Sequence, residues 1–236
     1  MKSLIVFCLF LLSLVFVQFA QAQTVDEVID KYINAIGGKE KLMAIKTIKM
    51  TGNLNVQGFD VGVVTTASHG VGVRTDISVP GMGEGFQIMT PTKGWGFMPF
   101  QGQTAPEEVG EDQVKAGQNS LDLQGPLLNY KEKGSTVELL GKEKAEGKDC
   151  FKLKLTNKFG KVTTIFIDAT DYYRIKSVST ANINGEETEV ETVYSDFKKD
   201  ANGYVFAYAQ TSPRGTINYS TIEVNIAVDE KIFKPQ

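Results

Sequence analysis

Hydrophobic and polar residues alternate along most of this chain, and a period of two is typical of β-strands that bury one face. In the segment 150–156, for example, apolar residues alternate with lysines. Other segments, such as 204–209, are apolar on both faces, which predicts strands that are covered on both sides. The pattern predicts strands over 48–57, 59–68, 71–79, 85–90, 93–99, 136–140, 150–156, 162–168, 173–183, 188–197, 204–212 and 216–228.

Tight-turn sequences separate several of these strands: Gln57-Gly58, His69-Gly70, Asn184-Gly185 and Asn202-Gly203. Strands joined by tight turns pair antiparallel, so the order along the chain predicts a meander. About a dozen strands cannot form a flat sheet, which must curl on itself or split into a sandwich. The apolar parity shifts between Tyr219 and Ile222, which predicts a β-bulge that helps the last strand bend.

A helix precedes the strands and has clear end signals. Thr24 and Glu27 form a capping box, in which each side chain accepts a hydrogen bond from the other residue's backbone. Gly37-Gly38 predicts the helix end, and 39–44 predicts a second short helix. The apolar residues that follow Thr24 fall at helical spacing on one face: Val25, Val28, Ile29, Tyr32, Ile33 and Ile36. This stripe must pack on the sheet, because so short a helix is not stable alone.

The segment 104–130 interrupts the strand pattern. Its acidic first half predicts a short helix over 108–116, and its second half carries an apolar patch around Gly125-Pro126. No repeat, linker or charge block divides the chain, so 23–236 is expected to form a single domain of the mainly β, α+β class. The tail after Asp229 is expected to be loose except at Ile232 and Phe233.

The first 22 residues predict a secretory signal peptide. Lys2 is followed by an apolar run over 4–19 and by Ala20-Gln21-Ala22, a small-x-small cleavage site. Cleavage after Ala22 would leave a mature chain that begins at Gln23. Cys8 lies inside the apolar run, not at the cleavage point, so a lipoprotein signal is not indicated. The run has no stop-transfer flank, so the protein is not expected to be an integral membrane protein.

Composition excludes several function classes. The 236 residues carry a formal charge of −3 with no basic tract, which argues against nucleic acid as a partner. After cleavage one cysteine remains, Cys150, and its alternating strand context predicts a packed small hydrophobe. His69 is the single histidine and no nucleophile elbow is present, so we expect no catalytic residue, no metal site and no cofactor. A hydrolase would have to use His69 as its base.

Several segments carry a resemblance to a known family. The clearest is 92–100, Thr-Lys-Gly-Trp-Gly-Phe-Met-Pro-Phe, a turn followed by a Trp and an aromatic-x-Pro-Phe strand. Weaker matches are 25–32 with Gly37-Gly38, 140–153, 194–197, 224–225 and 233–235. Together they resemble the periplasmic lipoprotein carriers of Gram-negative bacteria, the LolA-like family, and the related outer-membrane lipoprotein-sorting proteins.

The resemblance implies an unclosed β barrel wrapped around helices, with a hydrophobic cavity that accepts acyl chains. In the carriers, an arginine followed by proline on an early strand bonds to a helical lid; here Arg74 is the nearest arginine and no proline follows it. Soft and aromatic side chains are concentrated near the Trp strand, and methionine adapts well to irregular acyl chains. The predicted ligand-binding residues are Arg74, Phe86, Met89, Trp95, Phe97, Met98 and Phe100.

The leading hypothesis is a periplasmic, non-enzymatic carrier or chaperone for the acyl chains of a lipid or lipoprotein, which serves lipoprotein sorting to the outer membrane. Its expected partners are lipid or acylated protein cargo and envelope transport proteins. The alternative is a non-enzymatic cell-envelope module on the same scaffold, which would bind another protein through the surface of 104–130.

Overall fold

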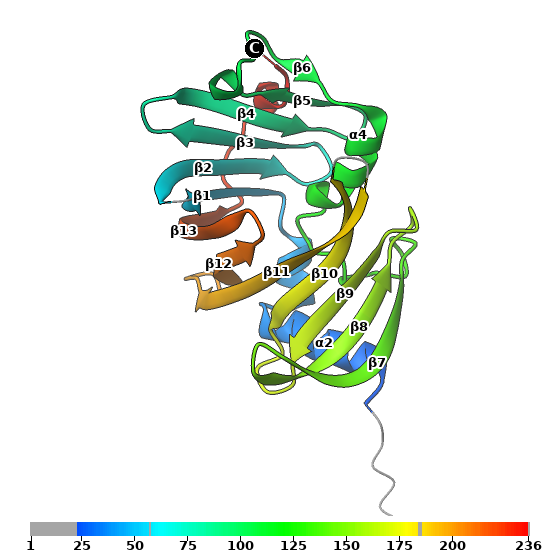
Figure 1. Cartoon of the computed structure of the whole chain (residues 1–236). Helices are drawn as coiled ribbons and strands as arrows, with labels where there is room; N and C mark the ends of the chain where they lie inside the picture. The colour runs from blue at the N-terminus through cyan, green and yellow to red at the C-terminus, as the bar shows by residue number, and fades with distance from the viewer. Residues whose placement is uncertain (1–22, 57, 184–185, 236) are drawn as a thin grey trace, which may run out of the picture.

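The computed structural model of the protein describes residues 23–56, 58–183 and 186–235, and in these residues thirteen strands form one antiparallel sheet (Figure 1). The strands are β1 (Thr47–Val56), β2 (Phe59–Ser68), β3 (Gly72–Val79), β4 (Gly83–Met89), β5 (Gly94–Phe97), β6 (Glu107–Glu108), β7 (Thr136–Ala145), β8 (Lys148–Thr156), β9 (Val162–Asp168), β10 (Arg174–Ile183), β11 (Glu186–Lys199), β12 (Val205–Ser212) and β13 (Gly215–Val224). The helices are α2 (Val25–Ala35), α3 (Lys39–Met43) and α4 (Glu111–Gly117), with the 3₁₀ turns η1 (Pro99–Gln101), η2 (Gln118–Leu121) and η3 (Glu230–Phe233). The predicted signal peptide, Gln57 and the Asn184-Gly185 turn lie outside the described residues.

The sheet consists of two meanders that one long-range pairing joins. Its strand order is β6-β5-β4-β3-β2-β1-β13-β12-β11-β10-β9-β8-β7, so the first and last strands are neighbours in the middle. Thr51 faces Thr221 and Gly52 faces Tyr219, which leaves Ser220 as the extra residue of a bulge. The bulge predicted in this strand is therefore confirmed, and it helps the sheet curl without closing, since β6 and β7 remain unpaired edges.

Helix α2 fills the lower half of the concave side (Figure 1). Its capping box is present, with Glu27 N donating to Thr24 Oγ1 at 3.2 Å and Thr24 N donating to Glu27 Oε2 at 2.8 Å. Gly38 N donates to Ile33 O at 2.9 Å, and Gly37 has the positive φ of 134° that a helix end of this type requires. The buried stripe of α2 packs against residues of β8 and β9 in the main core: Phe151, Leu153, Leu155, Ile165 and Ile167.

The segment between β6 and β7 contributes its second half to the core. Leu121, Leu127 and Leu128 are all at most 6% exposed, and Tyr130 is also buried. Helix α4 begins three residues later than predicted, because the two residues Glu107 and Glu108 pair with β5 as β6 instead. The apolar patch read around Gly125-Pro126 is therefore a buried segment that passes under the sheet's open side (Figure 1).

The convex face of β3, β4 and β5 is covered by the C-terminal segment. Phe233 is 3% exposed and packs with Phe86 and Ile88. A Cβ built on Gly72 of β3 would lie 2.5 Å from Cγ of Phe233, so the aromatic ring rests on bare backbone there. The tail is thus anchored where Ile232 and Phe233 were expected to hold it, and the side chain of Asp229 caps η3 by accepting a hydrogen bond from Lys231 N.

The fold class predicted from the alternation is confirmed as one curled, unclosed antiparallel sheet with few short helices. Strand bounds agree closely, except that β7 runs on to Ala145 and β13 ends at Val224. Asn225 ends β13, because it adopts a φ of 58° and its side chain accepts a hydrogen bond from Lys46 N. Among the described helices, none is long and apolar enough to cross a bilayer.

Replacing Phe233 by Ala removes the ring that covers β3–β5, so we expect the free energy of unfolding to fall by about 3 kcal/mol. The measurement is urea denaturation followed by circular dichroism. Phe159→Ala is the matched control, because Phe159 is 54% exposed in a turn, and its loss should be near zero. Equal losses for the two variants would contradict a structural role for η3.

Asp168 is the second anchor that can be tested, because its buried carboxylate accepts three hydrogen bonds. The donors are Lys148 Nζ and the backbone N–H groups of Thr170, at 2.8 Å, and Asp171, at 3.4 Å. Burial alone would raise the pKa of this carboxyl, but the bonds from Lys148, Thr170 and Asp171 outweigh burial and hold the pKa below its ordinary 3.8. The carboxylate therefore stabilises the fold above pH 3.8 and loses this contribution as the pH falls through the lower folded-state pKa.

We expect Asp168→Asn to lower the free energy of unfolding at pH 7 by about 1–3 kcal/mol. The loss between wild type and variant should shrink as the pH falls below about 4. Thermal melts from pH 7 to pH 3 measure this, with Asp112→Asn, on the exposed face of α4, as the control for charge. A difference that stays constant across this range would show that the ionised carboxylate is not the stabilising form.

Candidate functional site

A cavity of about 440 Å³ lies on the concave side of the sheet. The sheet from β8 to β1, the helices α2 and α3, and the segment 119–126 line it. Most of its wall is apolar, and the side chains come from elements that are far apart in sequence: Ile45, Met50, Leu155, Ile165, Phe206 and Ile222. Because each of these belongs to a hydrophobic core cluster, the cavity extends from the core to an opening at the surface.

One arginine interrupts this apolar wall. The guanidinium carbon of Arg174 lies 4.2 Å from the centre of the Tyr194 ring, and Tyr194 Oη lies 3.1 Å from Ser177 Oγ. A register shift between Arg174 and Lys176 brings Arg174 opposite Ile167, on the same face as Ser177. Without that bulge, Arg174 would point to the convex side with Lys176.

The phenol of Tyr32 in the cavity wall remains protonated at neutral pH. Burial raises the pKa of Tyr32, and the positive charge of Arg174 opposes this increase only in part. The wall therefore combines this neutral hydroxyl group and the hydroxyl of Ser177, which can donate hydrogen bonds, with one cation.

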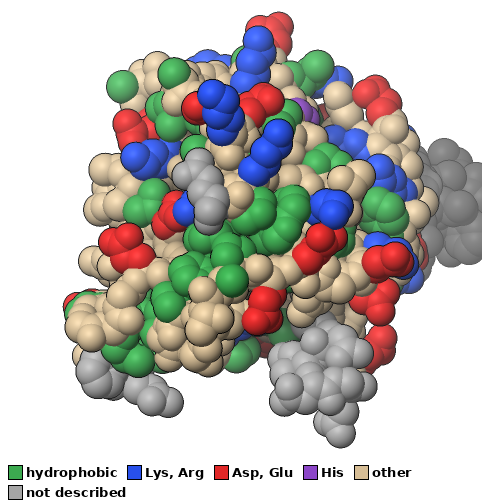
Figure 2. Space-filling view, turned by 90° about the horizontal axis from the view of Figure 1, so that it is seen from above, with side chains coloured by type: hydrophobic (Ala, Val, Ile, Leu, Met, Phe, Trp, Pro, Cys, Tyr) green, Lys and Arg blue, Asp and Glu red, His purple; other side chains and the backbone are tan. Residues whose placement is uncertain are grey.

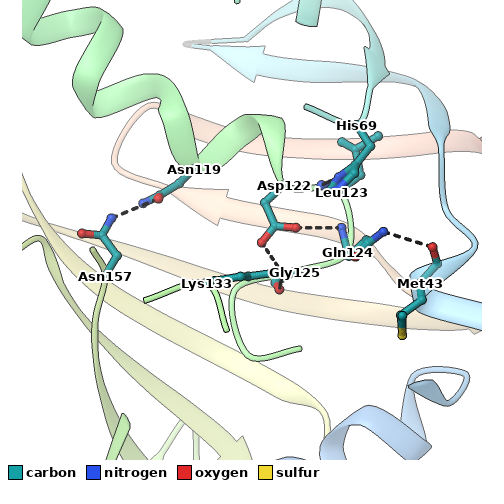
Figure 3. A network of polar contacts seen from close by, with 9 residues as sticks. All are labelled: Met43, His69, Asn119, Asp122, Leu123, Gln124, Gly125, Lys133 and Asn157. Carbon is teal, nitrogen blue, oxygen red and sulfur yellow. Dashed lines mark hydrogen bonds and ion pairs between the residues drawn. The ribbon is translucent and has the colours of Figure 1, made fainter. Parts of the chain in front are cut away.

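A polar network holds the segment 119–126 across the open side of the sheet (Figure 3). Lys133 Nζ donates to Asp122 Oδ2 at 2.6 Å and to the carbonyl of Gly125 at 2.8 Å. Gly125 has a φ of 89°, which other residues rarely adopt, so the turn that Lys133 closes depends on glycine.

The same segment is tied to three further parts of the molecule (Figure 3). Leu123 N donates to His69 Nδ1 in the β2–β3 turn at 3.2 Å, and Gln124 Nε2 donates to the Met43 carbonyl at 3.0 Å. Asn157 Nδ2, in the β8–β9 turn, donates to Asn119 Oδ1 at 3.0 Å. The cover of the cavity is thus attached by individual hydrogen bonds and one ion pair, and not by a continuous strand ladder.

Four of the predicted ligand-binding residues lie on the convex face, under the C-terminal segment. Phe86, Trp95 and Phe97 pack in one cluster with Phe233. Arg74 lies over the Phe86 ring at 4.4 Å and donates to Asp76 Oδ1 at 2.7 Å and to the Ile232 carbonyl at 3.3 Å. The arginine that was predicted to bind ligand therefore contacts η3.

The other three predicted residues, Met89, Met98 and Phe100, lie toward the opposite face. Met98 and Phe100 approach the side of β4 to which a Cβ on Gly85 would point, and Met89 lies against Gly117 at the end of α4. None of the seven residues lines the cavity on the concave side. Their role in ligand binding stays a prediction.

Two residues with possible chemical roles are used structurally. His69 accepts the hydrogen bond from Leu123 N, so its Nδ1 is occupied. Cys150 is fully buried, burial raises the pKa of its thiol, and its packing confirms the prediction of a small hydrophobe. The described residues contain no group of three or more His, Cys, Asp and Glu side chains placed to hold a metal ion.

The surface at the end that carries β5 and β6 mixes charges of both signs (Figure 2). Hydrophobic side chains reach the surface in a strip at its centre, with Lys and Arg on either side of it. No basic tract of the kind that binds nucleic acid is visible on this face.

Lys133→Met removes the cation between the Asp122 carboxylate and the Gly125 carbonyl. We expect the backbone amides of 118–126 to exchange hydrogen for deuterium about tenfold faster, because a half-buried carboxylate without a partner favours the open segment. Lys115→Met is the control, since Lys115 is exposed and pairs only within α4. Unchanged exchange over 118–126 would show that this ion pair does not hold the segment.

Comparisons with known proteins agree on the fold. No family model and no curated protein sequence matches the chain. A solved LolA-superfamily protein from Nitrosomonas europaea has a TM-score of 0.56 at 14% identity, covering 90% of this chain and 98% of its own. A DUF1329 family protein from Desulfovibrio piger has a TM-score of 0.58 at 13% identity, covering 90% of this chain and 98% of its own. A domain from Vibrio parahaemolyticus described as an outer membrane lipoprotein-sorting protein domain has a TM-score of 0.54 at 14% identity, covering 88% of this chain and 94% of its own. The resemblance stated from the sequence is thereby confirmed at the level of the fold, since the unclosed β barrel of this protein is similar to the fold of these three structures.

Proposed function

We propose that this protein is an exported, non-enzymatic carrier that holds an acyl chain in the cavity on the concave side of its sheet. The cargo is the acyl part of a lipid or lipoprotein, and the site of action is the periplasm. The observation that carries the proposal is the cavity itself, with its volume of about 440 Å³ and its mostly apolar wall. Ligand pockets typically measure about 300–1,000 Å³ and are lined by apolar groups with a few polar ones.

The cover of the cavity suits a carrier that must both load and release. The segment 119–126 is fixed by a few hydrogen bonds, the Asp122–Lys133 ion pair and the buried side chain of Leu121. Residues 122–126 can open while Leu121 stays buried and without unfolding the sheet, since the strand ladders do not depend on their contacts. Opening there would expose Leu123 and the apolar wall to an incoming chain.

Export is supported by the N-terminal sequence, where the apolar run and the Ala-Gln-Ala site have the order of a cleaved signal. The description of the Vibrio domain as a lipoprotein-sorting protein domain is consistent with acylated protein as the cargo of this chain. A ligand longer than the cavity would extend toward Met89, Met98 and Phe100. Arg74, Phe86, Trp95 and Phe97 could take part only if η3 moved away.

The alternative, a protein-binding module that uses the surface of 104–130, has less support. Leu121, Leu127 and Leu128 of this segment are buried in the fold, so its second half is not free to recognise a partner. The exposed part is limited to the region around β6 and α4.

Mass spectrometry of the gently purified periplasmic protein tests the proposal, and we expect a co-purifying acyl lipid or acylated peptide near one per chain. Met50→Trp replaces a thioether side chain in the cavity wall by a bulkier indole ring. The ligand content of this variant should fall at least about fivefold while its circular dichroism spectrum is unchanged. Met82→Trp is the matched control, because Met82 is 59% exposed in the β3–β4 turn and does not line the cavity, and it should keep the ligand.

Absence of an acyl ligand from the wild type, together with no uptake of added fatty acid, would reject the carrier. Co-purification of one envelope protein without lipid would favour the binding module. A ligand content that Met50→Trp leaves unchanged would place the ligand outside this cavity.

A further inference from the structure

The cavity contains an arginine whose charge the protein leaves unbalanced. The chain has three arginines. Arg74 pairs with Asp76, and Arg214 is exposed in the β12–β13 turn. Arg174 lies in the cavity wall, and within the described residues it has neither an ion pair nor a side-chain hydrogen bond. Its guanidinium lies over the ring face of Tyr194. A ring face attracts the cation but cannot accept the five N–H bonds of a guanidinium.

No acid in the cavity wall is available to neutralise this charge. Of the described residues that line the cavity, only Arg174 and Asp122 have side chains that are charged at neutral pH. Asp122 is already paired with Lys133 at 2.6 Å. The cavity wall therefore carries one net positive charge, on a half-buried side chain that no acid in the wall neutralises.

Neutral hydrogen-bond donors lie beside the guanidinium. Ser177 and Tyr194 share one hydrogen bond at 3.1 Å and lie on the same face as Arg174. Tyr32 lies close enough to feel the charge of Arg174, and burial raises its pKa, so its hydroxyl keeps its proton. A cation with hydroxyl donors around it is a typical environment for carboxylate or phosphate oxygens.

We propose that the ligand of this cavity is an anionic amphiphile, and that Arg174 binds its headgroup while the alkyl chain lies along the apolar wall. This inference rests on the proposed carrier function and adds the charge of the cargo to it. The shared chemistry is an oxyanion attached to an alkyl chain, which either a free fatty acid or a lipid phosphate supplies. The cavity would then select against neutral glycerides and alcohols.

The test compares ligand pairs that differ only in the anion, by isothermal titration of the mature protein freed of bound lipid. The carboxylate pair is palmitate and methyl palmitate, and the phosphate pair is palmitoyl lysophosphatidate and monopalmitoylglycerol. We expect the wild type to bind one or both anionic ligands about 10- to 100-fold more tightly than the neutral partner. Charge-assisted hydrogen bonds in a partly desolvated site contribute an affinity difference of this size. Which pair shows the larger ratio distinguishes the two sources.

Three variants locate the effect. Arg174→Met keeps the length and apolar stem, and it should abolish the preference for the anion while leaving the affinity for the neutral ligand unchanged. Arg174→Lys keeps the charge but loses the planar fork, and should retain part of the preference. Arg214→Met, on the exposed turn, should behave as wild type.

The outcomes separate this inference from the carrier function. If wild type and Arg174→Met bind each anionic ligand as tightly as its neutral partner, the cavity is an acyl site and Arg174 is not its anchor. If the wild type binds none of the four ligands, both the inference and the carrier function fail. A loss of all binding in Arg174→Met and Arg174→Lys, with neutral ligands included, would show a structural role for Arg174 instead.

Discussion

The pairing of β1 with β13 is the constraint on which the rest of the structure depends. Without it, the chain would form two separate meanders, β1–β6 on one side and β7–β13 on the other, each with exposed apolar faces. The ladder joins residues 47–56 to residues 215–224, and the bulge at Ser220 bends the joined sheet. Once the sheet curls, the stripe of α2 has a concave surface to fill, and the segment 119–126 has an open side to cover. The cavity is the volume that these two elements leave unfilled.

Much of this fold could be predicted from local sequence, because strand alternation, the capping box and the Asn-Gly turns are local signals. Thr24 and Glu27 are an example, since their roles depend only on residues within one helical turn. The partner of β1 is not a local property. Nothing in residues 47–56 identifies 215–224 as their neighbour. The shift in apolar parity predicted a bulge in the last strand, but it did not predict which strand pairs with it. The β6 pair was missed because two residues are too short to show a period.

The site was harder to predict than the fold, for a definite physical reason. Alternation tells which residues share a face, but not whether that face is concave. Phe86, Trp95 and Phe97 share a face as expected, and the apolar side chain that covers it comes from Phe233, more than a hundred residues later. Arg174 was missed because a bulge beside it reverses its parity, so in the sequence it groups with the outward-facing Lys176. Two features of the sequence could have drawn attention to Arg174. It follows Tyr172 and Tyr173, and it is one of only three arginines in the sequence.

The separation of β1 from β13 and η3 along the sequence also sets the order in which the molecule can be assembled. A ribosome completes β1 at Val56, yet the strand that pairs with its free edge begins only at Gly215. Until then the edge of β1 is a template for wrong pairing, and the convex face of β3–β5 is bare. For the export proposed above, the same delay is favourable, because a polypeptide that is threaded through a narrow channel must not pair β1 with β13 before both have passed. The separation of these two strands is therefore a hazard in the compartment of synthesis and an advantage for the proposed export.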